Sequence, residues 1–289
     1  METVCEKGGI ATALNAKIYG NGSETLVLAH GYGEDQSAWQ LLLPLLACYF
    51  KVVVFDMVFS PNVDPKLYDP QRYQTDFKGY TDDLVCFLDH LHLHNTIYLG
   101  HSMVAMVGCL ASIRRPNLFT HLILLSGSPK FIHNDVGTMM IPNSWYINDG
   151  RYYGGFERSE VNEICKNIEQ NFTGWVQNFA PKAAGQNNTA TGAKFEKTLG
   201  RMKPYIALSA AKTVFSSDFR HKLPQVMVPC TIIQSKKDVI VPQSVAFYIK
   251  NNVGGDATVK ILNTEGHFPH LSAHNLLFRV LKETIQIKN

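Results

Sequence analysis

The feature that most constrains the fold of this chain is a serine at the junction of a strand pattern and a helix pattern. A short β-branched run precedes the segment Gly100-His101-Ser102-Met103-Val104, and an apolar segment with small residues follows it. A strand that turns sharply into a helix at a serine is a nucleophile elbow, in which a strained backbone holds the serine Oγ clear of the sheet. Gly100 fits the usual G-x-S-x-G pattern, but Val104 stands where its second glycine belongs. This imperfect motif needs support from the rest of the chain.

Short β-branched or Leu-rich runs recur along the chain at spacings too long for hairpins. They lie at residues 25–29, 51–55, 96–99, 121–125, 230–233 and 258–262. Such runs are typical of strands buried on both faces of a parallel sheet, and helical patterns such as 80–93 and 271–285 lie between them. Because strands and helices alternate, the sequence predicts an α/β fold with a mostly parallel central sheet.

The alternation stops after residues 126–129 for about a hundred residues and resumes at Cys230. Within the interruption, short amphipathic helix patterns with many aromatic residues lie at 159–170, 173–179, 193–200 and 205–215. We expect one domain over 1–289, with a cap of four helices inserted at about 130–216. Such a cap would lie over the carboxyl ends of the strands, where α/β proteins enclose ligands.

Charge and composition exclude several classes of protein. The 27 basic and 24 acidic residues give a net charge of +3, and the tight basic pairs are Arg114-Arg115 and Lys236-Lys237. We therefore expect no nucleic-acid partner. Since no apolar stretch approaches the roughly 18 residues of a membrane span and the first residues lack a signal-peptide core, we expect no membrane attachment. Six scattered cysteines predict reduced thiols in the cytoplasm or nucleus.

Two further patterns are weak candidates for ligand binding. His90, His92 and His94 end a helical pattern in which only His90 and His94 are neighbours, so a solvated helix end is favoured over a metal site. Gly8-Gly9 and Gly154-Gly155 lack the strand and helix of a phosphate loop. We expect no metal and no cofactor.

Serine-based acyl transfer needs a general base and an acid that orients it, and in this type of fold the chain order is serine, acid, histidine. Ser102 is the candidate nucleophile, and His267 follows the last predicted strand closely enough to act as the general base. Asp238 lies just beyond the preceding strand and is the candidate acid. Asp218 and Asp256 compete for this role, but neither follows such a strand.

An oxyanion hole is predicted from the segment Ala29-His30-Gly31-Tyr32-Gly33, which follows the first predicted strand. Its glycines let the backbone bend so that the Tyr32 N–H faces the reacting carbonyl, and the Met103 N–H would be the second donor. Loss of one such donor typically raises the barrier by about 3–4 kcal/mol. Nucleophile, acid, base and oxyanion donors in this order, each at a strand end, predict a serine hydrolase.

With these residues in place, the sequence resembles the plant strigolactone and karrikin receptor family of α/β hydrolases. The matching segments lie at 28–39, 111–116, 154–157 and 266–272, so the resemblance spans nearly the whole chain. Met103, the turn at 58–60 and Phe268 are more similar to a third branch of receptor-like paralogues than to either well-known receptor.

The resemblance implies that Ser102, Asp238 and His267 form a catalytic triad below the cap. In such proteins the serine attacks a butenolide ligand, the butenolide is retained covalently for a time, and turnover is slow. The cap then recruits an F-box protein and a repressor target, and we expect the chain itself to be monomeric. Carried over position by position, the pocket wall consists of Tyr32, Phe131, Phe156, Trp175, Phe179, Val214, Phe215 and Ile240.

The chain departs from the family pattern at three places. Val104 replaces a small residue, usually Ser, and such a change can crowd the elbow or shift the start of the helix. Tyr32 replaces the customary Phe and would place a hydroxyl at the pocket mouth. The segment 132–146 has no counterpart and enters the chain just before the first cap helix, where a long loop can reshape the pocket or a partner surface.

Three functions therefore remain open from the sequence. The first is a receptor-type serine hydrolase that binds and slowly cleaves a butenolide. The second is a general carboxylesterase that acts on another small ester and has no signalling partner. The third is a non-catalytic binding protein in which Val104 and the insertion have disabled the chemistry.

Overall fold

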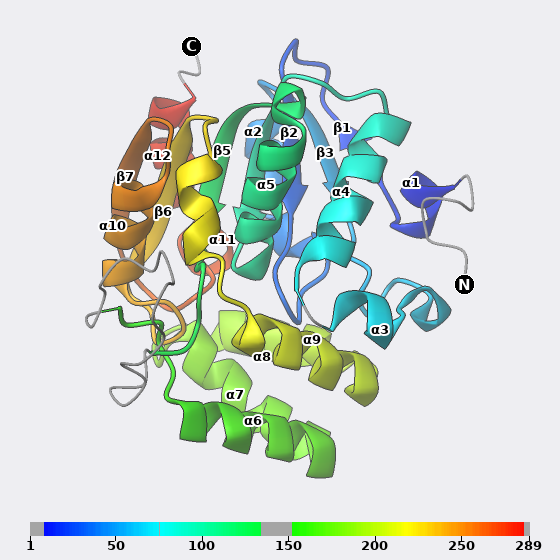
Figure 1. Ribbon diagram of the computed structural model, residues 1–289, viewed down its shortest axis with the longest axis vertical. Helices are drawn as coiled ribbons and strands as arrows, with labels where there is room; N and C mark the ends of the chain where they lie inside the picture. Colours follow the sequence, from blue (N-terminus) through cyan, green and yellow to red (C-terminus); the bar gives the residue numbers. More distant parts are fainter. Residues whose placement is uncertain (1–8, 75, 134–151, 286–289) are drawn as a thin grey trace.

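The computed structural model, described over residues 9–74, 76–133 and 152–285, contains one seven-stranded sheet (Figure 1). Its order is β1-β3-β2-β4-β5-β6-β7, and every pair of neighbours is parallel except β1 and β3. All six runs expected from the sequence form strands. The bounds are β1 Lys17–Tyr19, β2 Thr25–Ala29, β3 Lys51–Phe55, β4 Thr96–His101, β5 Phe119–Leu125, β6 Cys230–Lys237 and β7 Ala257–Glu265.

Helices cover both faces of the sheet and bury two apolar cores. The longer helices α4 (Lys78–His90), α5 (Met103–Arg114) and α10 (Gln243–Asn252) pack on one face (Figure 1). The opposite core contains α2 (Leu43–Leu46) and α12 (His274–Thr284). This three-layer arrangement confirms the expected α/β class. The remaining short helices of this part are α1 (Ile10–Ala13), α3 (Pro70–Tyr73) and α11 (Pro269–Ser272).

A second group of helices lies beyond one end of the sheet, between β5 and β6 in the chain (Figure 1). It consists of α6 (Arg158–Gln170), α7 (Phe172–Ala184), α8 (Thr189–Leu199) and α9 (Pro204–Ser216). We call these four helices the cap. Polar side chains fasten it to the sheet layer: Lys194 Nζ donates to the Ser37 carbonyl at 2.7 Å, and Thr213 Oγ1 donates to the Tyr73 carbonyl at 2.6 Å.

The chain leaves the sheet layer at Phe131 and returns toward the cap at Phe156. Ile132 forms a parallel bridge with Phe156, and the His133 N–H donates to the Phe156 carbonyl at 2.9 Å. The two ends of the intervening segment are thus paired. The insertion expected at 132–146 lies outside the described residues from position 134 onward.

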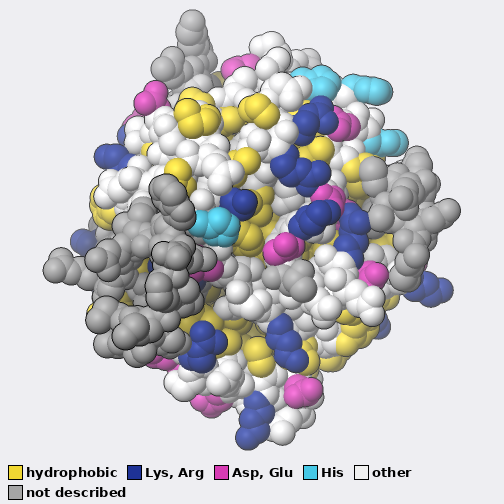
Figure 2. Space-filling view, viewed as in Figure 1, with side chains coloured by type: hydrophobic (Ala, Val, Ile, Leu, Met, Phe, Trp, Pro, Cys, Tyr) yellow, Lys and Arg dark blue, Asp and Glu magenta, His cyan; other side chains and the backbone are white. Residues whose placement is uncertain are grey.

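The surface shown in Figure 2 mixes basic and acidic side chains. Arg114 forms an ion pair with Asp82 of α4, and Arg115 contacts Asp89 of the same helix at 2.9 Å. The tight basic pair of the sequence is therefore neutralised by aspartates. In the described part of the chain, every helix is too short or too polar to cross a membrane.

Among the residues that the structure describes, four cysteines are free thiols, namely Cys48, Cys109, Cys165 and Cys230. Cys86 is disulfide-bonded. The expectation that all six cysteines are reduced is therefore wrong at Cys86.

Candidate active site

Ser102 links β4 directly to α5 in a strained backbone conformation. Its φ of 59° and ψ of −129° lie outside the regions that a residue with a side chain readily adopts. A Cβ at Gly100 would lie 2.8 Å from the Val104 carbonyl oxygen, so the turn needs a glycine there. The Val104 side chain is fully buried in the core, and α5 begins at Met103. The valine that departs from the motif therefore packs inside the core and leaves the elbow intact.

The structure brings the three predicted side chains into one hydrogen-bonded chain. His267 Nε2 lies 2.9 Å from Ser102 Oγ, and His267 Nδ1 lies 2.8 Å from Asp238 Oδ2. All three residues are buried. Because the aspartate can only accept, Nδ1 carries the hydrogen and Nε2 presents a lone pair to the serine hydroxyl. This arrangement can remove the serine proton when the oxygen attacks a carbonyl carbon.

Backbone groups hold the aspartate and the histidine in place. The main-chain N–H groups of Ile240 and Val241 donate to Asp238 Oδ1 at 2.8 and 3.2 Å. The His267 N–H donates to the Ala183 carbonyl of the cap at 2.8 Å. Gly266, with a φ of 91°, passes so close to the cap that a Cβ would lie 1.9 Å from the Ala184 carbonyl oxygen. The loop that carries His267 is thus packed directly against α7.

The two predicted oxyanion donors lie beside the serine. Tyr32 and Met103 both line the same cavity as Ser102. Among the described residues, no acceptor is bonded to the main-chain N–H of either residue. The Tyr32 hydroxyl donates to the Ala207 carbonyl of α9 at 3.0 Å, so it joins the oxyanion loop to the cap. The hydroxyl that the sequence places at the pocket mouth therefore already forms a hydrogen bond with the cap.

The cavity above Ser102 is narrow and almost wholly apolar. Its volume is about 50 Å³. Trp175 and Phe179 of α7 stack with ring centroids 5.0 Å apart, and Phe156 meets Phe215 edge to face at 5.1 Å. All eight residues expected in the pocket wall line this cavity. The others that line it are His101, Ser102, Met103, Ile164, Ala183, Phe195, Ala211, His267 and Phe268.

Phe195 is a wall residue that the sequence did not reveal. It comes from α8, and its ring centroid lies 4.3 Å from that of Phe268, which follows His267. Within the pattern of α8 it reads as an ordinary apolar position of an amphipathic helix. Its contact with the His267 loop exists only in the folded chain, so periodicity alone could not identify it.

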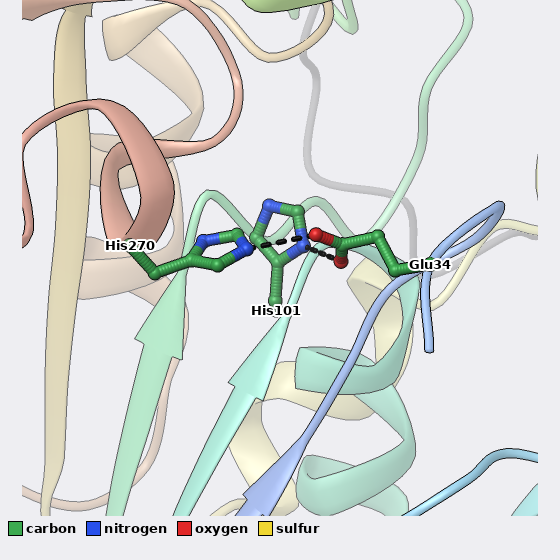
Figure 3. A group of neighbouring side chains, drawn as sticks. All are labelled: Glu34, His101 and His270. Carbon is green, nitrogen blue, oxygen red and sulfur yellow. Dashed lines mark hydrogen bonds and ion pairs between the residues drawn. The ribbon is translucent and has the colours of Figure 1, made fainter. Parts of the chain in front are cut away.

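A second cluster consists of one carboxylate and two histidines, Glu34, His101 and His270 (Figure 3), and His101 directly precedes Ser102 in the chain. Glu34 Oε2 lies 2.7 Å from His101 Nδ1, and Glu34 Oε1 lies 2.8 Å from His270 Nε2. The three residues are fully buried or nearly so. Burial by itself would raise the pKa of the Glu34 carboxyl, but the interactions of Glu34 with His101 and His270 hold that pKa well below its usual range. Burial lowers the pKa of His270 to about 4, against the opposing pull of Glu34. Sequence reasoning did not single out this cluster.

A mostly parallel sheet, a serine on a strained turn and a helical cap above it together define the α/β hydrolase class. A sequence model described as the alpha/beta hydrolase fold matches residues 24–273. The chain is 44% identical to strigolactone esterase RMS3 of Pisum sativum, over 94% of this chain and 97% of the relative. It is 41% identical to karrikin insensitive 2 receptor CA of Petunia hybrida, over 95% and 96%. The chain belongs to the α/β hydrolases, in the family of strigolactone esterases and karrikin receptors.

Solved structures show the same fold at greater sequence distance. A hydrolase from Oleispira antarctica superposes with a TM-score of 0.87 at 29% identity and covers 99% of this chain and 100% of its own. An enol-lactonase from Burkholderia xenovorans superposes with a TM-score of 0.77 at 13% identity, over 95% and 98%. The expected fold class and family are confirmed, and the chain is a hydrolase of this family.

Proposed function

We propose that the protein binds a butenolide and cleaves it slowly, with Ser102 as nucleophile, His267 as general base and Asp238 as the acid that orients the base. The observation that carries this proposal is the unbroken chain from Asp238 through His267 to the Ser102 hydroxyl. A hydroxyl 2.9 Å from a histidine lone pair is ready for deprotonation. The same distance argues against a non-catalytic binding protein.

In the proposed reaction, Ser102 Oγ attacks the carbonyl carbon of the lactone while its proton passes to His267 Nε2. The main-chain N–H groups of Tyr32 and Met103 stabilise the negative charge that develops on the carbonyl oxygen. The bond from the carbonyl carbon to the leaving oxygen then breaks, and His267 returns the proton to that oxygen. Water, activated by the same histidine, hydrolyses the acyl-serine.

The pocket supports a small ligand. Its volume of about 50 Å³ is far below the roughly 300–1,000 Å³ of sites for drug-sized molecules. The aromatic wall offers dispersion contacts, and Ser102 and His267 bring the groups of the proposed chemistry to the cavity. A compact lactone ring next to Ser102 fits this description better than a long acyl chain. The names of the relatives, which include an esterase of strigolactones and a karrikin receptor, favour the same ligand class.

Signalling partners follow from the family rather than from the site. We infer that the cap presents the ligand-bound state to an F-box protein and a repressor target, in the cytoplasm or nucleus. The partner test is a pull-down of the F-box protein with and without a butenolide. Capture that depends on ligand supports the receptor function, and hydrolysis without such capture favours a general carboxylesterase.

The proposed chemistry is tested by intact-protein mass spectrometry after incubation with a fluorogenic butenolide probe. The wild-type protein should release the fluorophore slowly and carry a butenolide adduct on Ser102 or His267. Ser102→Ala should abolish both, because it removes the hydroxyl that is proposed to attack the ligand. Equal release by wild type and Ser102→Ala would overturn the proposal. Cys109→Ala, a buried thiol outside the pocket wall, serves as a matched control for substitution by alanine near the sheet.

A further inference from the structure

Glu34 is the point at which three loops near the proposed triad meet. Its Oε2 accepts a hydrogen bond from the Gly31 N–H at 2.8 Å, next to the oxyanion donor Tyr32. The same oxygen contacts His101, the residue before Ser102. Its Oε1 contacts His270 of α11, three residues after His267. One buried carboxylate therefore joins the oxyanion loop, the nucleophile elbow and the segment that follows the general base (Figure 3).

His101 extends this connection to the base itself. Its Nε2 lies 2.8 Å from the main-chain carbonyl oxygen of His267. A carbonyl can only accept, so His101 Nε2 must carry a hydrogen. The main chain of His267 is thus fixed from two sides, by His101 at its carbonyl and by Ala183 of the cap at its N–H.

The hydrogen-bond partners also define the charge of the cluster. Glu34 accepts from the Gly31 N–H and faces two histidines, a set of partners that favours the ionised carboxylate. His101 Nδ1 then also carries a hydrogen, which makes the ring an imidazolium. His270 is neutral, with its hydrogen on Nε2, and its buried Nδ1 has no partner among the described residues. Glu34 and His101 thus form a buried ion pair with no net charge.

We propose that Glu34, His101 and His270 are positioning residues that hold the loops of the proposed triad in register through a buried carboxylate and imidazolium pair. This inference rests on the proposed role of Ser102 and His267. None of the three residues supplies a proton to the reaction. Their effect passes through main-chain groups of Gly31 and His267, whose displacement by about 1 Å can lower a rate by about a hundredfold.

Substitution Glu34→Gln preserves the size of the side chain but cannot preserve its partners. An amide oxygen at the Oε2 position accepts from Gly31 but leaves the imidazolium without a counter-charge. An amide nitrogen at that position opposes the Gly31 N–H, donor to donor. Either orientation loosens one of the loops. Other charged groups near the cluster are Lys194 of α8, Asp35 of the same loop, and the proposed pair Asp238 and His267.

Asp35→Asn is the matched control, because it makes the same chemical change one residue away. Asp35 is also buried, and its Oδ1 accepts from the Ser37 N–H at 2.9 Å. An asparagine can cap this turn in the same way. The control therefore removes one negative charge from the same loop without touching Gly31, His101 or His270.

The first measurement is nitrogen-15 NMR of the histidine side chains at pH 8, which needs no variant to be informative. The wild-type protein should show one imidazole protonated on both nitrogens, assigned by its loss in His101→Asn. Asp35→Asn should retain this signal, and Glu34→Gln should lose it. Absence of a doubly protonated imidazole in the wild type overturns the proposal. One equivalent of bound metal, measured by elemental analysis of the purified protein, also overturns it, since a metal would take the lone pairs of the histidines.

The second measurement is steady-state hydrolysis of p-nitrophenyl acetate. In Glu34→Gln we expect kcat to fall about tenfold to a hundredfold. KM should stay within about twofold, because Glu34 does not line the cavity. Asp35→Asn should match the wild type. Hydrolysis that depends on Ser102 but not on Glu34 overturns this inference alone, whereas hydrolysis that does not depend on Ser102 overturns the proposed function.

Discussion

Two pairs of carboxylate and histidine lie next to each other below the cap, and they differ in what the second histidine nitrogen faces. In the pair of Asp238 and His267, that nitrogen faces the Ser102 hydroxyl in the cavity. In the pair of Glu34 and His101, it faces the carbonyl oxygen of His267. The ring centroids of the two histidines lie only 4.8 Å apart.

This difference shows that a buried carboxylate and histidine pair is not by itself a catalytic device. His267 presents a lone pair to a hydroxyl and can therefore take a proton. His101 presents a hydrogen to a carbonyl and can therefore only hold the backbone. Both pairs combine a buried carboxylate with a buried histidine, so the acceptor or donor character of the third partner decides the role.

The largest effect should come from Asp238→Asn, which changes the carboxylate of the proposed catalytic pair. The amide N–H would face His267 Nδ1, so the ring would carry its hydrogen on Nε2 and lose the lone pair that Ser102 needs. We expect kcat/KM for p-nitrophenyl acetate to fall about 10³- to 10⁴-fold. This is at least ten times the loss expected for Glu34→Gln.

Asp218→Asn is the matched control for this prediction. Asp218 was one of two competing acids in the sequence, and the structure pairs it with Arg220 at 2.6 Å, outside the cavity wall. Its substitution should leave kcat/KM within about twofold. If Asp238→Asn kept a tenth of the wild-type rate, the two carboxylates would not differ in role as proposed.

A smaller effect, on stability, should come from His270→Asn. The pKa of His270 is about 4 in the folded protein, against an ordinary value of about 6.5 in the unfolded chain. The folded state binds this proton less tightly than the unfolded state does. The free energy of unfolding is therefore highest above pH 6.5 and declines as the pH falls toward 4. The decline amounts to about 3 kcal/mol over that window. Asparagine does not titrate, so the variant should lack this part of the pH dependence.

Urea unfolding between pH 4 and pH 8 measures this prediction. The difference in unfolding free energy between pH 7 and pH 4 should be about 3 kcal/mol smaller in His270→Asn than in the wild type. His94→Asn makes the same change at an exposed histidine and should keep the wild-type profile. Parallel curves for His270→Asn and wild type would show that His270 has the same pKa in the folded and unfolded states, which would contradict this prediction.

The sheet and the triad positions were predictable because their signals are local in the sequence. Each β-branched run forms a strand, and Ser102, Asp238 and His267 each follow the strand expected to place them. Strand β1 was missed because it has only three residues, too few for a strand pattern to stand out in the sequence. The order of the parts along the chain was enough to bring the triad residues together.

The cluster around Glu34 gave no comparable signal. Its members lie 67 and 236 residues apart in the chain, and none forms a pattern with the others. His101 and His270 read as neighbours of catalytic residues, and Glu34 reads as a loop acid on a solvated turn. Only the approach of three strand ends in the folded sheet buries that acid between two histidines. Similarly, Val104 looked like a threat to the elbow because its buried place in the core could not be known in advance.

The smallest effect should come from Tyr32→Phe, which removes the outer anchor of the oxyanion loop and leaves the inner one. The lost hydrogen bond to the Ala207 carbonyl of α9 should lower the unfolding free energy by about 1 kcal/mol. The rate of hydrolysis should change by less than about threefold, because the Gly31 N–H remains hydrogen-bonded to Glu34. Tyr205→Phe is the control, since its hydroxyl also joins α9 to the sheet layer, at 3.2 Å from the Pro65 carbonyl, but at the surface.

A double-mutant cycle then separates the two anchors. If Glu34 holds the loop from inside, the rate loss of Tyr32→Phe should be larger in the Glu34→Gln background than alone, because the loop then has neither anchor. Simple additivity of the two rate losses would mean that the anchors act on different parts of the site. In that case the hydroxyl of Tyr32 would stabilise the position of the cap, and the cluster around Glu34 would hold the oxyanion loop independently of that hydroxyl.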